Sequence, residues 1–356
     1  MSAPAVPPTG APTRDRDRRS QDLDVTDGAG VPEPVIAPLR GGEPGPRPPF
    51  VEHPTHPGVP RAAERDGSPW HPYSPCGQDC LPPAARPARL RSARRAAALL
   101  AVVATAVLAL PVVALFGRRA TDAATYRIFR AVLRAAGIRL QVNGGSTFAD
   151  GGGALVVANH LSWIDVVALG AVQPVRMIAK REVGDWPVVG AIAARTGALF
   201  VDRAGLRALP AVVDETADAL RAGAVVGVFP EGTTWCGSAA GPFRRAPFQA
   251  AVDAGAAVRP VTLELRLADG RPTTAASFVG DETLAGSLRR VLALDGLVCE
   301  LTLHPLLRPG PGDDRRVLAA RARRVVTGAV ARPVSSPVSG SSVAAVQPTR
   351  TEATAA

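Results

Sequence analysis

Residues 139 to about 331 alternate short β-branched runs with helical stretches, and this alternation limits the fold more than any other feature of the chain. The helical stretches include DVVALGAV, VVGAIAART and LPAVVDETADALRAG, the last ending in Gly223, a residue suited to a helix C-cap. A final helix is expected over 313–331. The pattern predicts an α/β domain whose mixed, largely parallel sheet is flanked by helices. The expected strands are LQV (140–142), ALVVA (154–158), VRMIA (175–179), ALFV (198–201), AVVGVF (224–229), VRPVTLEL (258–265) and CELTL (299–303).

The first ninety residues have a different character. Residues 1–90 are rich in proline, glycine and charged side chains and lack aliphatic periodicity, so we expect them to be disordered, as we do the Ser/Thr/Pro/Ala tail at 332–356. The start of the chain has no secretory signal pattern. His71, Cys76 and Cys80 could contribute to a metal site, but their spacing is not a standard zinc pattern. A short aromatic docking segment is the favoured interpretation.

Residues 91–138 predict a membrane-associated two-helix segment. The run 96–116 contains no charge and, as a helix, is about 30 Å long, the thickness of a bilayer core. Arginines flank both ends and Pro111 interrupts the run, which favours a segment that dips into one leaflet over one that spans; a buried soluble helix is the other alternative. Residues 124–138 form a basic amphipathic helix suited either to an anionic bilayer or to packing on the domain.

The charge and the cysteine content restrict the possible binding partners and the cellular compartment. The net charge of +10 favours anionic partners, either nucleic acid or an anionic membrane. No nucleic-acid motif or aromatic-interleaved basic stretch is found, so we expect no nucleic-acid partner. Four scattered cysteines are too few for a disulfide framework, which indicates a reduced, cytosol-facing protein. The expected location is the cell membrane, with the α/β domain on the cytoplasmic side.

The stretch NHLSWID places polar side chains in apolar surroundings directly after a predicted strand. Ser162 and Asp165 have the spacing of a helix start, so Asp165 could simply cap a helix. A short loop and that first turn would also fold Asp165 back beside His160. The carboxylate could then hold one ring nitrogen's proton and leave the other nitrogen as a base. Because the chain lacks a G-x-S-x-G elbow, any nucleophile must come from the substrate, most simply a hydroxyl.

Two further motifs end predicted strands. GALFVDR (197–203) ends in an Asp-Arg pair, and VFPEGTT (228–234) ends in a carboxylate, a glycine and two hydroxyls. Each alone could be a solvated turn. Because the carboxyl ends of parallel strands meet at one edge of a sheet, the motifs together with NHLSWID predict a shared cleft.

These motifs resemble the ordered blocks of the glycerolipid acyltransferases typified by bacterial 1-acylglycerol-3-phosphate acyltransferase. NHLSWID resembles the family's N-H-x-S-x-x-D box, GALFVDR its second block, FPEGTT its third and VRPV (258–261) its fourth, and the resemblance extends over about 122–308. It implies that 139–331 is an acyltransferase domain, with His160 and Asp165 catalytic. The implied substrate-binding residues are Asn159, Ser162, Lys180, Arg203, Glu231, Gly232, Thr233 and Thr234.

The resemblance also implies a reaction. His160 would take the proton from a lysolipid hydroxyl as it attacks an acyl thioester of acyl-CoA or acyl-carrier protein, with membrane lipids as surroundings. Backbone N–H groups near Gly232 or Ser162 could stabilise the oxyanion. No metal or cofactor is expected, and His304 is interpreted as structural.

The chain departs from the family pattern at one position, which leaves the identity of the acyl acceptor open. Lysophosphatidate enzymes usually carry arginine after F-P-E-G-T, where this chain has Thr234, which supplies no charge. The expected acceptor is lysophosphatidate, giving phosphatidate; the alternatives are another lysolipid, such as lyso-ornithine lipid, or a glycolipid. A non-catalytic membrane-binding scaffold is the alternative from another class. The basic residues that could replace the arginine are Lys180, Arg181, Arg203, Arg244 and Arg245.

Overall fold

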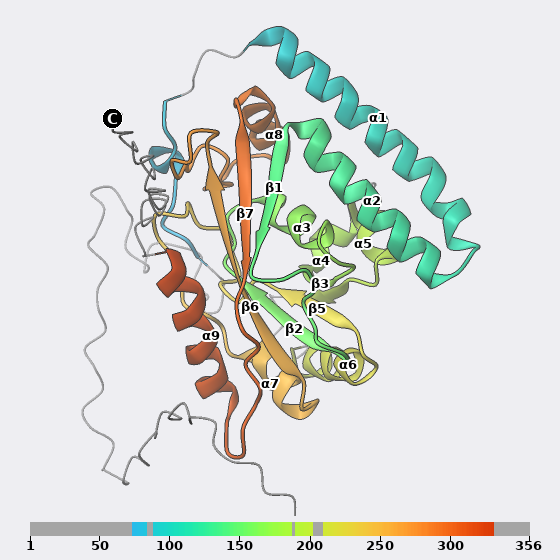
Figure 1. Ribbon diagram of the computed structural model, residues 1–356, viewed down its shortest axis with the longest axis vertical. Helices are drawn as coiled ribbons and strands as arrows, with labels where there is room; N and C mark the ends of the chain where they lie inside the picture. The colour runs from blue at the N-terminus through green and yellow to red at the C-terminus, as the bar shows by residue number, and fades with distance from the viewer. Residues whose placement is uncertain (1–72, 84–87, 187–188, 202–208, 331–356) are drawn as a thin grey trace, which may run out of the picture. The chain divides into compact units, whose positions relative to one another are not determined.

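All seven expected strands form and join in one sheet in the computed structural model, which describes residues 73–83, 88–186, 189–201 and 209–330 (Figure 1). Their order is β1-β7-β6-β2-β5-β3-β4. The β6–β7 pair is antiparallel and the other pairs are parallel, which confirms the mixed, largely parallel sheet. The strands are β1 Ile138–Asn143, β2 Ala154–Ala158, β3 Arg176–Lys180, β4 Leu199–Val201, β5 Val225–Val228, β6 Ala257–Arg266 and β7 Leu297–Leu303.

Helices cover both faces of this sheet. One core is shared with α2, α3 and α8, and the other with α6, α7 and α9. The final helix and the left-handed Gly223 after α6 are both confirmed. The sequence did not predict helices at the positions of α7 and α8. The helices are α1 Arg89–Ala114, α2 Arg118–Ala136, α3 Trp163–Gly170, α4 Arg181–Gly184, α5 Val189–Arg195, α6 Leu209–Arg221, α7 Ala246–Asp253, α8 Leu284–Ala293 and α9 Arg315–Val330, with a short 3₁₀ helix at Gln78–Cys80.

The central strand β2 shows why the sequence forms these layers. All five of its residues are buried. Val156 and Ala158 point into one core, while Leu155 and Val157 point into the other. A strand buried on both faces reads as a continuous apolar run, because successive side chains alternate between the faces. The polar residues that follow β2 therefore emerge at the edge of a rigid strand.

The helix α1 is long and apolar enough to cross a membrane, judged by its length and composition alone, and only 11% of its apolar window is buried. That exposure argues against a buried core helix. Its amino-terminal part is tied to the end of α8, where Arg95 donates to the carbonyl of Leu292 at 3.1 Å. The neighbouring helix α2 packs on the domain: Leu133 is buried in the core and the Phe129 ring lies against Gly170. Domain packing is thus the role of the apolar face of α2.

Residues 73–83 form an ordered segment before α1, although the sequence places them in the disordered region. Cys76 is buried there, and the carbonyl of Cys80 accepts a hydrogen bond from Thr274 at 2.7 Å. Composition alone does not reveal such contacts, because the partners lie far along the chain. The expectations for 1–72 and for 332–356, and for His71 and Arg203, concern residues outside the described part.

Candidate active site

The turn between β2 and α3 gathers three donors on one carboxylate oxygen. Ser162 caps α3, its hydroxyl accepting from the N–H of Ile164. Oδ2 of Asp165 accepts from the backbone N–H groups of Leu161 at 2.5 Å and Ser162 at 2.8 Å and faces Nδ1 of His160 at 2.8 Å. The capping interaction and the His–Asp pair are therefore the same local structure. Asp165 is fully buried, so these donors replace the lost hydration of Oδ2, while Oδ1 has no hydrogen-bond partner among the described residues.

The His160 ring is held on two sides. It stacks on the Phe229 ring with centroids 3.9 Å apart and planes 6° from parallel. The Asp165 contact places the proton of the neutral imidazole on Nδ1, which leaves Nε2 as the acceptor. The side chain remains 20% exposed while Asp165 is 0% exposed. His160 is thus oriented, reachable and suited to act as a general base.

Glu231 connects the loop after β5 to the His160 turn. Its Oε2 accepts the His160 backbone N–H at 2.7 Å, and its Oε1 accepts the Gly241 N–H at 2.8 Å. Burial raises the pKa of this carboxyl to about 7, although the two N–H donors oppose that shift. Both oxygens face backbone donors, so Glu231 positions the His160 turn.

Asn159 has a similar positioning role. Its side chain donates to the carbonyl of Leu263 at 2.9 Å and accepts the Leu263 N–H at 2.8 Å. It is 5% exposed, and both ends of its amide are engaged by β6. Asn159 and the capping residue Ser162 are both buried and bonded to the backbone, and the substrate contacts that the resemblance implies for them stay predictions.

The third block, 229–234, folds over the His160 turn. The N–H of Trp235 donates to the carbonyl of His160 at 2.7 Å. Thr234 donates its hydroxyl to the Phe278 carbonyl, while Thr233 is half-buried beside it. Gly232 has φ of 79°, a left-handed conformation that suits glycine. Lys180 is exposed at the end of β3, on the same carboxyl edge of the sheet as His160, and Arg203 lies outside the described residues.

Two N–H groups considered for the oxyanion are already engaged. The N–H of Ser162 donates to Asp165, and the N–H of Gly232 donates to the Phe229 carbonyl at 3.0 Å. His304 has the expected structural role: its Nε2 lies 2.8 Å from the Thr262 hydroxyl, and burial lowers its pKa. Phe229 lies within the third block but received no role from the sequence, whereas Gly241, Leu263 and Phe278 lie outside the motifs and carry no local signal.

The fold and the site together indicate a class of α/β protein with a candidate general base. A His–Asp pair stands at the carboxyl edge of an α/β sheet, and no hydrogen bond in the described residues joins His160 to a serine or cysteine side chain. An oriented His–Asp pair of this kind can act as a general base on a hydroxyl group.

Comparison with known proteins agrees with this class. Residues 139–264 match the family model described as Acyltransferase. A lyso-ornithine lipid O-acyltransferase from Pseudomonas aeruginosa is 38% identical over 173 residues, covering 48% of this chain and 66% of that protein. A 1-acyl-sn-glycerol-3-phosphate acyltransferase from Neisseria meningitidis serogroup B is 33% identical over 210 residues, covering 59% of this chain and 82% of that protein. The chain belongs to this acyltransferase family and is an O-acyltransferase.

A solved structure shares the fold. The 1-acyl-sn-glycerophosphate (LPA) acyltransferase PlsC from Thermotoga maritima superposes with a TM-score of 0.53 at 18% identity, covering 67% of this chain and 96% of that chain. At this identity the likeness concerns the fold, and it confirms the α/β architecture.

Proposed function

We propose that the protein transfers a fatty acyl group from acyl-CoA or acyl-carrier protein to the free hydroxyl of lysophosphatidate, giving phosphatidate. The observation that carries the proposal is the His160–Asp165 pair, with Nδ1 and Oδ2 2.8 Å apart and the ring partly exposed. The same geometry argues against a non-catalytic scaffold, which has no need of an oriented base.

The proposed reaction has one bond-forming step. Nε2 of His160 takes the proton of the acceptor hydroxyl as its oxygen attacks the thioester carbon. The carbon–sulfur bond breaks, and the imidazolium returns the proton to the departing thiolate. Asp165 stabilises the imidazolium between these events. General-base assistance of this kind contributes roughly 10²–10⁴-fold in rate.

The identity of the acyl acceptor is the most specific part of the proposal. The Neisseria relative, named for 1-acyl-sn-glycerol-3-phosphate, and the exposed cations Lys180, Arg181 and Arg244 support a phosphomonoester acceptor. Lyso-ornithine lipid is the second candidate, because Thr234 brings no charge and spends its hydroxyl on the Phe278 carbonyl, and because the Pseudomonas relative is named for that lipid. The exposed apolar surface of α1 supports attachment to the cell membrane, with the domain on the cytoplasmic side where the thioester donors are made.

The test is transfer of a labelled acyl group by the full chain in detergent. Lysophosphatidate and lyso-ornithine lipid are supplied in parallel, each with acyl-CoA and with acyl-carrier protein. His160→Ala is expected to abolish transfer, and His304→Gln, which changes a histidine bonded to Thr262, serves as the matched control. Transfer to lysophosphatidate supports the first proposal, and transfer only to lyso-ornithine lipid replaces it with the second. Silence with both acceptors and all donors overturns both.

A further inference from the structure

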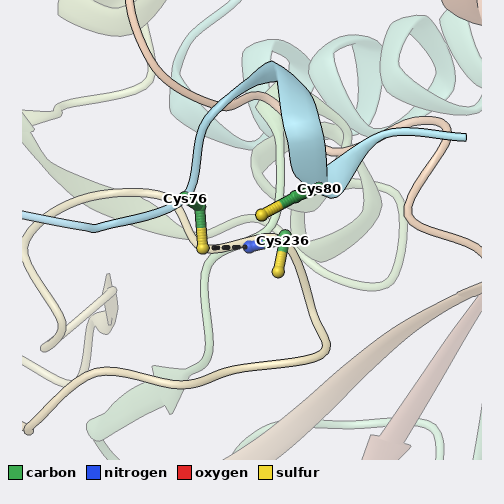
Figure 2. Close-up of side chains that lie close together, drawn as sticks. All are labelled: Cys76, Cys80 and Cys236. Carbon is green, nitrogen blue, oxygen red and sulfur yellow. Dashed lines mark hydrogen bonds between the residues drawn. The ribbon is translucent and has the colours of Figure 1, made fainter. Parts of the chain in front are cut away.

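Three cysteines from distant parts of the sequence meet beside the catalytic loops. Cys76 and Cys80 come from the ordered segment before α1, and Cys236 comes from the loop that follows the third block (Figure 2). Their three Sγ atoms all lie within 4.8 Å of one another. All three are free thiols. The sequence suggests only a Cys76–Cys80 pair with His71, and the fold supplies Cys236 in its place.

The spacing of the sulfurs fits a single ion. Zinc–thiolate bonds of about 2.3 Å in a tetrahedral site place the sulfurs about 3.8 Å apart. A four-iron cluster binds each cysteine to a different iron atom and so spreads the sulfurs further. A disulfide would use only two of the three sulfurs that lie within 4.8 Å of one another.

A backbone N–H group contacts one of the sulfurs. The N–H of Cys236 donates to Sγ of Cys76 at 3.3 Å, so the backbone of one cysteine bonds the side chain of another. Such contacts stabilise thiolate charge and orient metal ligands.

The surroundings favour a closed structural site with one side open. Cys76 and Cys236 are 6% and 4% exposed, and Trp235 and Val279 pack around them. Cys80 is only half-buried and forms the accessible side. Three soft ligands in an apolar shell are the donor set that zinc prefers among the common divalent ions.

We propose that Cys76, Cys80 and Cys236 together bind one Zn²⁺ ion, with the fourth position on the exposed side. The ion joins the segment before α1 to the loop that continues from Glu231. This metal is structural and takes no part in acyl transfer. The sequence alone predicts no metal for this chain.

The bound ion would stabilise the catalytic turn indirectly. Cys236 follows Trp235, whose N–H holds the His160 carbonyl, and its own carbonyl accepts the Ser277 hydroxyl at 2.9 Å. The next residue, Phe278, donates its N–H to the Leu161 carbonyl at 2.8 Å. A crosslink at Cys236 therefore restrains both loops that contact the His160 turn.

The test measures metal content of the full chain, purified in detergent without chelators and with a phosphine reductant. We expect about one zinc per chain. Cys76→Ser, Cys80→Ser and Cys236→Ser should each lower this at least tenfold. Cys299→Ala is the matched control, because Cys299 is fully buried in the sheet, outside the cluster, and should retain full zinc.

A second measurement covers variants that fail to fold. Exchange of Co²⁺ into the wild-type chain should produce the near-ultraviolet thiolate-to-cobalt charge-transfer absorption, with an intensity that reports three sulfur ligands. A wild-type chain that takes up neither zinc nor cobalt overturns the proposal, as does a disulfide among these cysteines in chains alkylated directly in cells. None of these readouts depends on the acceptor lipid, so they remain informative if the proposed acyl transfer is absent.

Discussion

The charge of Asp165 gives the sharpest prediction about catalysis. Asp165→Asn keeps the shape of the side chain but removes the negative charge beside His160. At a separation of about 4 Å and an effective dielectric constant near 20, that charge stabilises the imidazolium by about 4 kcal/mol. Losing it should lower kcat by about 10³-fold. If the amide nitrogen turns toward Nδ1, the ring proton moves to Nε2 and the base is lost as well.

The assay is single-turnover acyl transfer from labelled acyl-CoA in detergent, which reports the chemical step. Ser162→Ala is the matched control: it removes the helix cap in the same turn, costing about 1 kcal/mol of stability, and leaves the His–Asp contact in place. Thermal unfolding of both variants separates folding defects from chemistry. If folded Asp165→Asn keeps a rate within about threefold of wild type, imidazolium stabilisation by Asp165 is wrong.

Three further predictions concern the supports of the site. Burial raises the pKa of Glu231 to about 7, so the folded protein holds this proton more tightly than the unfolded chain does. The stability that this proton contributes is therefore greatest below about pH 4.5 and is lost as the pH rises through 7. Glu231→Gln should remove that pH-dependent part, as denaturant unfolding at several pH values would show, and an unchanged wild-type–variant difference across this range would contradict it. Asn159→Ala should cost about 2–4 kcal/mol of unfolding free energy, since both Leu263 backbone groups lose partners; a loss below about 0.5 kcal/mol would exclude the role. Gly170→Ala places a methyl 1.9 Å from the Phe129 ring and should cost about 1–3 kcal/mol, which thermal unfolding tests; an unchanged Tm would mean that the ring moves aside freely.

Much of the architecture follows from local patterns. The β-branched runs predict all seven strands, and the two strands that are buried along their whole length, β2 and β5, are short apolar stretches. The first turn of α3 brings His160 and Asp165 together, because five residues suffice for a loop and a helix cap. The mixed sheet was predicted, but which pair is antiparallel was not, because strand direction depends on how the connections cross the sheet. The helices α7 and α8 were not predicted either.

The sequence by itself determined the strands, the exposed apolar helix and the His–Asp pair, because each depends on residues close together in the chain. Only the tertiary structure decided what supports them. Glu231 reaches the His160 N–H across 71 positions, Asn159 reaches Leu263 across 104, and Cys236 meets Cys76 across 160. Periodicity specifies which residues face a core but not which segments become neighbours. That choice depends on strand order, which is set by the packing of the whole domain.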